Sequence, residues 1–137
     1  KSIIKRLAIK GGRWSLERFV VGEIVVIPFP FSDLSSSKKR PALVLSQIQG
    51  DDIILCQITT ANRLDKYIID LEQKDFSKGN LKIKSIIRPN RIFTADKSLI
   101  KYKIGKINSE KINEVKQKIT EIFDLWGHKL WLQVLNI

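Results

Sequence analysis

The sequence has few of the residues on which metal sites, disulfides and many catalytic sites depend. Its 137 residues include one cysteine, one histidine and no methionine. A single cysteine, Cys56, excludes an intramolecular disulfide, and its position in the apolar run IILCQI predicts a small buried side chain. The histidine, His128, has no second histidine or cysteine near it in the sequence. We therefore expect no transition-metal site, no cofactor and no Ser-His-Asp triad.

Long hydrophobic runs are also missing. No run approaches the roughly 20 apolar residues that a membrane-spanning helix needs. The apolar stretch within residues 1–9 is too short for a signal peptide. A single cysteine suits a reducing compartment. We expect a soluble, cytoplasmic protein that does not associate with membranes.

Acidic residues are scarce relative to basic ones. The chain has 25 Lys and Arg residues against 14 Asp and Glu, a formal net charge of +11. Such an excess predicts a negatively charged partner, either a nucleic acid or an acidic protein. The alternative is a generally basic, solvated surface. A membrane surface is not favoured, because no amphipathic helix carries a wholly basic face.

The length predicts one domain with a real hydrophobic core. We expect an N-terminal extension over residues 1–18, a barrel domain over 19–126 and an apolar tail over 127–137 that packs on the barrel or on another subunit. Short apolar runs between turns predict strands at 23–29, 41–48, 52–59, 66–72, 83–88, 91–94 and 102–107. Pro28 and Pro30 indicate that the first strand is an edge strand. Lys78-Gly79-Asn80 is expected in a loop.

A helical period begins near residue 109. The apolar residues at spacings of three and four are Ile112, Val115, Ile119, Ile122 and Trp126, and the polar face carries Lys111, Glu114, Lys118 and Glu121. This pattern predicts an amphipathic helix over 109–126 that packs on the core. Asn108 or Ser109 would cap its start, and Gly127 would end it.

The segment GEIVVIPFPFSDLSSSKKRPALVLSQ, residues 22–47, combines two apolar runs with a polar, basic loop. The loop contains Ser35, Ser36, Ser37, Lys38 and Lys39 and ends at Arg40, whose guanidinium can hold a phosphate by two hydrogen bonds. The alternative for Arg40 is a surface residue in a solvated basic run. Phe29 and Phe31 can stack on unpaired bases, although Phe29 is favoured as barrel core.

This segment resembles the beginning of the PemK/MazF-like toxins of bacterial toxin-antitoxin pairs. The resemblance continues in the family's order through ILCQITT (54–60), FSKGNLKIKSIIRPNRIFTADKSLI (76–100) and KIGKINSEKINEVKQKI (103–119). It implies a mainly β fold, an SH3-like barrel of the PemK/MazF/CcdB type with a C-terminal helix. It also implies a homodimer.

The resemblance further implies a function. Members of this family are metal-independent endoribonucleases that cut single-stranded RNA, mainly messenger RNA, at selected sequences and so arrest growth until an acidic antitoxin binds. The implied nucleophile is the 2′-hydroxyl of the RNA, which leaves a cyclic phosphate.

The resemblance also implies which residues form the site. Arg40, Thr59 and Arg88 match the family's catalytic positions, while the RNA-binding candidates are Ser35, Ser36, Ser37, Lys38, Lys39, Phe31, Thr60 and Asn90. Asn90 stands where some members have an aspartate, and an amide is no general base at neutral pH. Asp33 and Asp96 are alternative bases, and the group that activates the nucleophile stays unassigned.

Two other functions remain open from the sequence. A gyrase poison of the CcdB type would share the fold and act through a C-terminal Trp-Gly-Ile, but here Trp126-Gly127 is followed by His128 and a further tail. A non-catalytic RNA-binding barrel is the second alternative, and the asparagine at position 90 leaves it open.

Overall fold

Two antiparallel sheets, two short 3-10 helices and one α-helix make up the part of the chain that the computed structural model describes, residues 8–10, 13–15, 18–29, 38–60 and 65–124. The smaller sheet pairs β1 (Ala8–Lys10) with β2 (Arg13–Ser15). The larger sheet has the strand order β6-β8-β5-β4-β3-β9-β7. Its strands are β3 (Glu23–Phe29), β4 (Lys38–Gln47), β5 (Asp52–Thr59), β6 (Ile69–Leu71), β7 (Phe76–Gly79), β8 (Ser85–Asp96) and β9 (Tyr102–Ile107).

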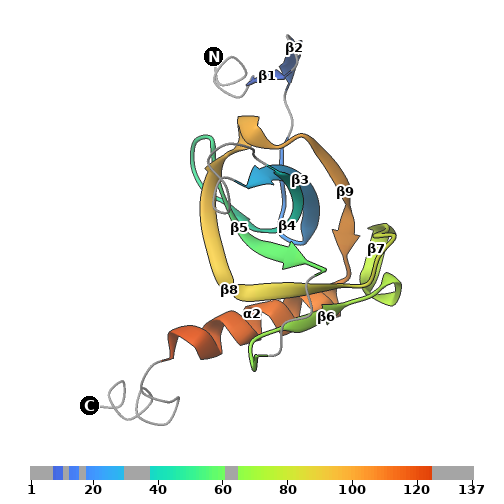
Figure 1. Ribbon diagram of the computed structural model, residues 1–137. Helices are drawn as coiled ribbons and strands as arrows, with labels where there is room; N and C mark the ends of the chain where they lie inside the picture. Colours follow the sequence, from blue (N-terminus) through green and yellow to red (C-terminus); the bar gives the residue numbers. More distant parts are fainter. Residues whose placement is uncertain (1–7, 11–12, 16–17, 30–37, 61–64, 125–137) are drawn as a thin grey trace, which may run out of the picture.

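The larger sheet curls strongly, and the single α-helix lies against it. In Figure 1, β8 and β9 bend around β3, β4 and β5, while α2 (Ser109–Phe123) runs along the lower side. The 3-10 helix η1 (Gln73–Asp75) connects β6 to β7, and η2 (Lys97–Leu99) connects β8 to β9; neither pair of strands is adjacent in the sheet. This architecture confirms the predicted fold class, a mainly β, SH3-like barrel with a C-terminal helix. Within the described residues no helix is long and apolar enough to cross a membrane.

Both faces of the sheet bury apolar side chains, because successive residues of a strand point to opposite faces. One cluster, here called the barrel core, comprises Phe19, Val25, Ile27, Phe29, Ala42, Val44, Ile53, Leu55 and Ile100. The other, the helix-side core, comprises Ile24, Leu43, Cys56, Ile58, Ile69, Leu71, Ile87, Ile107 and Val115. Strand residues therefore divide between two hydrophobic environments rather than between core and solvent.

Several strands match the sequence-based prediction and others differ. The strands at 23–29, 52–59 and 102–107 are confirmed as β3, β5 and β9. β4 begins at Lys38, so Lys38 and Lys39 lie in a strand and not in the expected loop. The predicted strand 66–72 is confined to β6, and the predicted loop around Lys78-Gly79 is wrong, since those residues belong to β7. Gly79 has φ of +69° and lies so close to Ile104 that a Cβ would clash with its carbonyl.

The prediction that residues 23–29 form an edge strand is also wrong. β3 lies between β4 and β9. Its pairing with β9, however, ends at Val26, whereas its pairing with β4 continues to Phe29. Pro28 therefore lies in the part of β3 that does not pair with β9, so its missing N–H removes no hydrogen bond to β9.

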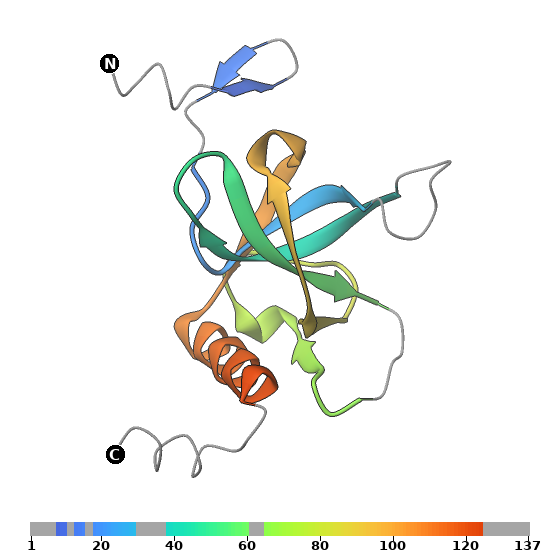
Figure 2. The same ribbon diagram turned by 90° about the vertical axis from the view of Figure 1, so that its left-hand side faces the viewer.

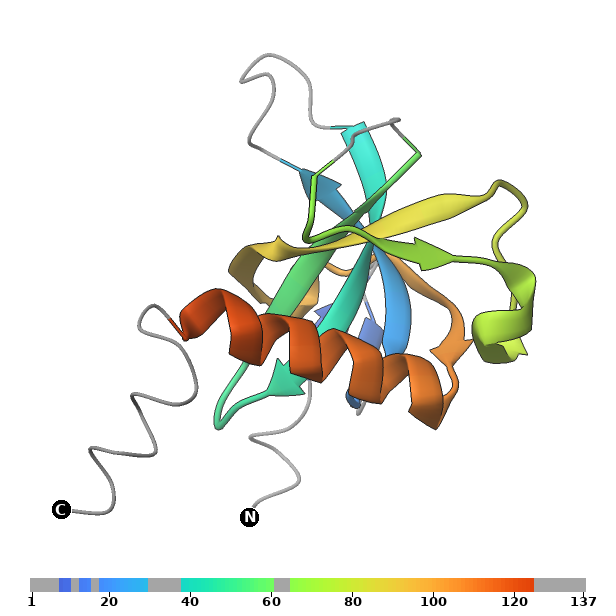
Figure 3. The ribbon, with the colours of Figure 1, turned by 90° about the horizontal axis from the view of Figure 1, so that it is seen from below.

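The helix follows its predicted pattern at the start but ends earlier. The side chain of Asn108 accepts a hydrogen bond from the backbone N–H of Lys111, which confirms the N-cap. Val115 is buried in the helix-side core, and Ile112 and Ile119 pack against that core. Figure 3 shows α2 lying across the strands of the sheet. The C-cap is Asp124, so the prediction that Gly127 ends the helix is wrong.

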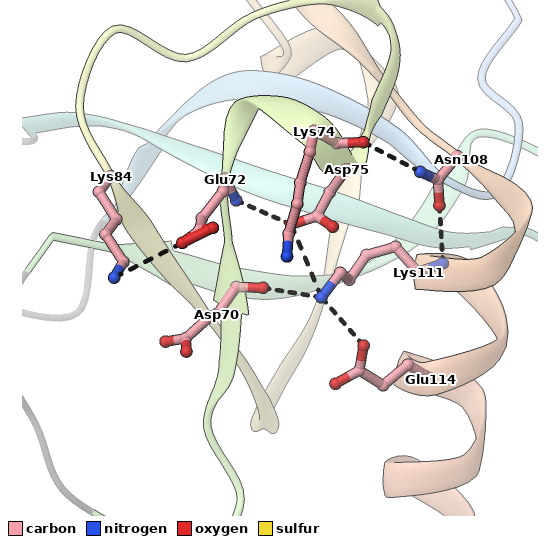
Figure 4. A network of polar contacts seen from close by, with 8 residues as sticks. All are labelled: Asp70, Glu72, Lys74, Asp75, Lys84, Asn108, Lys111 and Glu114. Carbon is pink, nitrogen blue, oxygen red and sulfur yellow. Dashed lines mark hydrogen bonds and ion pairs between the residues drawn. The ribbon is translucent and has the colours of Figure 1, made fainter.

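Lys111 lies on the predicted solvent face of the helix but is largely buried. Its amine contacts the Glu114 carboxylate at 2.9 Å, the Asp70 carbonyl at 3.0 Å and the Asp75 carboxylate at 3.6 Å (Figure 4). The side chains of Lys111 and Asp75 are only 11% and 10% exposed. This ion-pair cluster joins the first turn of α2 to β6 and η1.

Candidate nucleic-acid interface

The candidate site lies at the end of the sheet where β3 and β5 end and β4 begins. Figure 2 shows these three strand ends on one side of the molecule. β3 and β4 pair antiparallel, with Ile27 opposite Arg40 and Phe29 opposite Lys38. Directly opposed residues point to the same face of a sheet. Arg40 therefore belongs to the face of the barrel core, level with Ile27.

The strand register brings further polar residues onto that face. Ala42 of β4 is opposite Gln57 of β5, and Gln57 is opposite Arg88 of β8. Thr59, two residues further along β5, shares this face and is opposite Ile86. The same β4–β5 register, continued by two residues, brings Arg40 level with Thr59. Arg40, Thr59 and Arg88 thus come from three adjacent strands, with about 10 Å between the backbones of β4 and β8.

A bulge in β8 determines how Arg88 is presented. Cys56 pairs with Ile92 and the next residue, Gln57, pairs with Arg88, so residues 89–91 are left out of the β5 ladder. Pro89 has no N–H to donate, and a strand proline is tolerated at such a bulge. The predicted strands 83–88 and 91–94 are therefore one bent strand, and the bulge re-aims the side chains of SIIRPNR.

Arg88 is buried and incompletely paired. It is 7% exposed, and its Nη2 donates to Oδ2 of Asp65 at 3.4 Å. Its Nε is buried and has no acceptor within the described part of the chain. A guanidinium offers five N–H donors and always carries its charge. Arg88 thus has donors to spare for an anion.

Arg40 has a different environment. It is half-buried and makes no ion pair or side-chain hydrogen bond with the residues that the structure describes. Thr59 is buried and Thr60 is exposed. Lys38 and Lys39 are exposed at the start of β4, and Asn90 and Arg91 are exposed on the β8 bulge. This end of the sheet therefore combines five basic side chains with hydroxyl and amide groups, a composition suited to a phosphate backbone.

Three residues near the site were not identified from the sequence. Asp65 pairs with Arg88 across a sequence separation of 23 residues. Oε1 of Gln57 accepts a hydrogen bond from Nε of Arg91 at 3.3 Å. The β5–β8 pairing and the bulge bring Gln57 and Arg91 together, and the β6–β8 pairing brings Asp65 close to Arg88. No local sequence pattern points to Asp65, whereas Arg91 was visible as a second arginine in SIIRPNR.

Other sequence candidates lie elsewhere or outside the described residues. Phe29 is confirmed as barrel core, 5.0 Å between ring centroids from Phe93 in an edge-to-face contact. Asp96 is at the far end of β8, opposite Asp52, and its carboxylate accepts the Ser98 N–H. That bond keeps the pKa of Asp96 low. Because Asp96 and Arg88 lie towards opposite ends of β8, Asp96 is not placed to act as the alternative base at this site. Phe31, Asp33, Ser35, Ser36 and Ser37 lie outside the described residues.

Cys56 is confirmed as a buried structural residue. It belongs to the helix-side core, on the opposite face from Gln57. Burial raises the pKa of its thiol from 9.0 to about 12, so the thiol stays neutral in the folded protein at physiological pH. The described residues hold no group of three or more His, Cys, Asp or Glu side chains placed to bind a metal ion.

Comparison with known proteins gives one family match. Residues 21–123 match the family model of the PemK-like, MazF-like toxins of type II toxin-antitoxin systems. No curated protein matches the sequence.

Solved structures with the same fold share little sequence with this chain. An endoribonuclease in complex with its cognate antitoxin, from mycobacterial species, superposes with a TM-score of 0.64 at 14% identity, over 80% of this chain and 100% of that one. The Mycobacterium tuberculosis toxin MazF-mt6 gives a TM-score of 0.61 at 17% identity, over 77% and 99%. A MazE-MazF structure from Deinococcus radiodurans gives 0.56 at 17%, over 74% and 91%.

Proposed function

Because the chain belongs to the PemK-like, MazF-like toxin family of type II toxin-antitoxin systems, we propose that it is a toxin that acts as an endoribonuclease on single-stranded RNA, chiefly messenger RNA. Endoribonucleases and toxins are among the solved structures that share its fold. Cleavage at selected sequences would arrest growth in the cytoplasm.

The observation that carries this proposal is the presence of two arginines on one sheet face, with a threonine on the strand between them. Arg40 has no acidic partner in the described part of the chain, and Arg88 has an unused Nε. Two guanidinium groups can stabilise the charge that develops on a phosphodiester as it is attacked. In this proposal Thr59 orients a phosphate oxygen between them.

The RNA itself would supply the nucleophile. A 2′-hydroxyl that attacks its own phosphodiester needs no external water, and the products are a cyclic phosphate and a free 5′-hydroxyl. Arg88 would stabilise the leaving group. We assign no general base to Asn90, because an amide does not accept a proton at neutral pH.

The remaining proposed contacts concern binding. Lys38, Lys39, Thr60 and Asn90 are exposed at this end of the sheet and would contact phosphates or bases. The sequence adds Phe31, Ser35, Ser36 and Ser37 as further candidates. We also propose a homodimer, and an acidic antitoxin that covers the same basic surface and blocks RNA. One of the MazF-like solved structures is a MazE-MazF structure.

The deciding experiment compares two oligonucleotides in excess EDTA. One is all RNA, and its twin carries deoxyribose at the nucleotide before the cut. We expect the first to be cut to a cyclic phosphate and the second to bind without being cut. Cutting of the twin, or loss of RNA cleavage in EDTA, would refute 2′-hydroxyl attack. Binding of both without any cutting would support the non-catalytic barrel instead.

A further inference from the structure

Asp65 is the one described acidic side chain that contacts either arginine of the site. Its carboxylate uses its two oxygens differently. Oδ1 accepts the backbone N–H of Tyr67 at 2.8 Å, which closes a short turn, and Oδ2 faces Nη2 of Arg88 at 3.4 Å. The turn orients Oδ2, because the carboxylate cannot rotate without losing the bond to Tyr67.

The backbone around Asp65 is held to the strand that carries Arg88. β6 follows Asp65 closely, and its Ile69 pairs with Ile87 of β8, the residue next to Arg88. Ile69 and Leu71 are also buried in the helix-side core. The position of the carboxylate is thus tied to β8 by a ladder and by packing, although 23 residues separate Asp65 from Arg88.

Arg88 uses fewer of its hydrogen-bond donors than we expect of an arginine with a purely structural role. A buried guanidinium that only held the fold together would be expected to use all its donors, since a buried donor without an acceptor destabilises the fold. Here Asp65 engages one terminal nitrogen at a long distance and Nε has no acceptor within the described residues. The unmet donor suits an anionic oxygen that arrives from outside.

We propose that Asp65 is the positioning residue for Arg88, and that it holds one side of the guanidinium so that Nε is presented to a phosphate oxygen of the RNA. This proposal rests on the function proposed above. Asp65 acts through Arg88 and does not touch the reacting atoms. Asp65, from the segment before β6, therefore helps to orient the side chain of Arg88, which lies at the bulge of β8.

The first test is Asp65→Asn, which keeps an oxygen for the Tyr67 N–H but removes the negative charge beside Nη2. We expect kcat to fall about ten- to hundredfold, the range that misplacement of a catalytic group produces, with KM little changed and a cooperative thermal unfolding transition retained. The matched control is Asp70→Asn, which removes an exposed carboxylate on β6 that makes no contact with Arg88. It should retain parental kcat.

The second test is whether Asp65 acts through Arg88. In an Arg88→Ala background, Asp65→Asn should cause no further loss of kcat, because the group that it positions is gone. An additive loss in the double variant, or full kcat in folded Asp65→Asn, would overturn the proposal.

The third test does not depend on catalysis. The Nε–Hε resonance of Arg88, assigned by its disappearance in Arg88→Lys, should shift when the uncleavable deoxy-substituted oligonucleotide is added, and should broaden in Asp65→Asn. A resonance unchanged at saturation would overturn the proposal. A shift in a protein that cuts no RNA would support the anion contact at Arg88 while refuting the proposed endoribonuclease activity.

Discussion

Neighbouring residues of β4 illustrate how much one position matters at the scale of a single side chain. Lys39 and Arg40 are adjacent cations, but Arg40 shares a face with Ala42 and the barrel core, whereas Lys39 shares a face with Leu43 and the helix-side core. Of these two residues, Arg40 is thus the one on the face that also carries Thr59 and Arg88. Composition alone does not distinguish the two residues.

Replacing Arg40 by alanine should lower the rate of RNA cleavage at least about a hundredfold, since one charge contact to the transition state is removed. The fold should persist, because Arg40 has no ion-pair partner within the described residues. Lys116→Ala, on the exposed side of α2, removes the same charge far from the site and is the control. Equal rates for folded Arg40→Ala and parent would remove Arg40 from the mechanism.

Cys56 gives a residue-scale prediction about pH. Its pKa is raised from 9.0 to about 12 by burial, so the folded state disfavours the thiolate. The contribution of the neutral Cys56 thiol to the free energy of unfolding is fully present below about pH 9. It is lost as the pH rises towards about 12, because the unfolded chain releases the thiol proton at a lower pH than the folded chain. Urea denaturation between these pH values should show a steeper loss of stability for the parent than for Cys56→Ala. Parallel pH dependence in the two proteins would contradict the assignment.

At the scale of elements, the bulge of β8 and the anchoring of α2 are the features that sequence patterns describe least well. The sequence predicts two strands around Pro89 because a proline interrupts a ladder, but the chain pairs with β5 on both sides of it. The helical period likewise assigns Lys111 to solvent. Its long side chain instead reaches back to β6 and η1.

Removing the amine of Lys111 should loosen the first turn of α2. In Lys111→Met the buried Asp75 carboxylate loses its cation, and we expect the free energy of unfolding to fall by about 3 kcal/mol. Lys118→Met is the matched control. Lys118 pairs with Glu121 three residues later, as Lys111 pairs with Glu114, but the side chains of Lys118 and Glu121 are 27% and 57% exposed. Its cost should stay below about 1 kcal/mol. Urea unfolding of both variants measures the difference, and equal costs would show that the cluster is not a buried ion pair.

At the scale of the whole molecule, the net charge of +11 should appear in the salt dependence of RNA binding. If Lys38, Lys39, Arg40 and Arg88 each neutralise one phosphate, the logarithm of the binding constant should fall with the logarithm of salt concentration with a slope of about −3. The measurement is fluorescence anisotropy of the uncleavable oligonucleotide at several NaCl concentrations. Lys39→Ala should reduce the slope by about 0.7. A slope near zero would mean that the basic end of the sheet does not hold the phosphate backbone.

Local patterns predicted the parts of the fold that local physics controls. Alternating and apolar runs predicted β3, β5 and β9, and the period of 3.6 together with Asn108 predicted the start of α2. Each depends on residues within a few positions of one another, so the signal lies in a short window of sequence. The edge position assigned to β3 was wrong, because strand order depends on long-range pairing that one strand does not encode.

The amino-acid sequence by itself determined the excess of positive charge, the scarcity of cysteine and histidine, and the set of motifs that identify the family. Tertiary structure alone decided which of those residues share a face. Arg40, Thr59 and Arg88 come together because β4, β5 and β8 are adjacent in the sheet, and Asp65 meets Arg88 because β6 adds to the edge of β8. The physical reason is that strand order and register are fixed by hydrogen bonds and packing between distant segments, and a single-residue shift would turn each of these side chains to the opposite face.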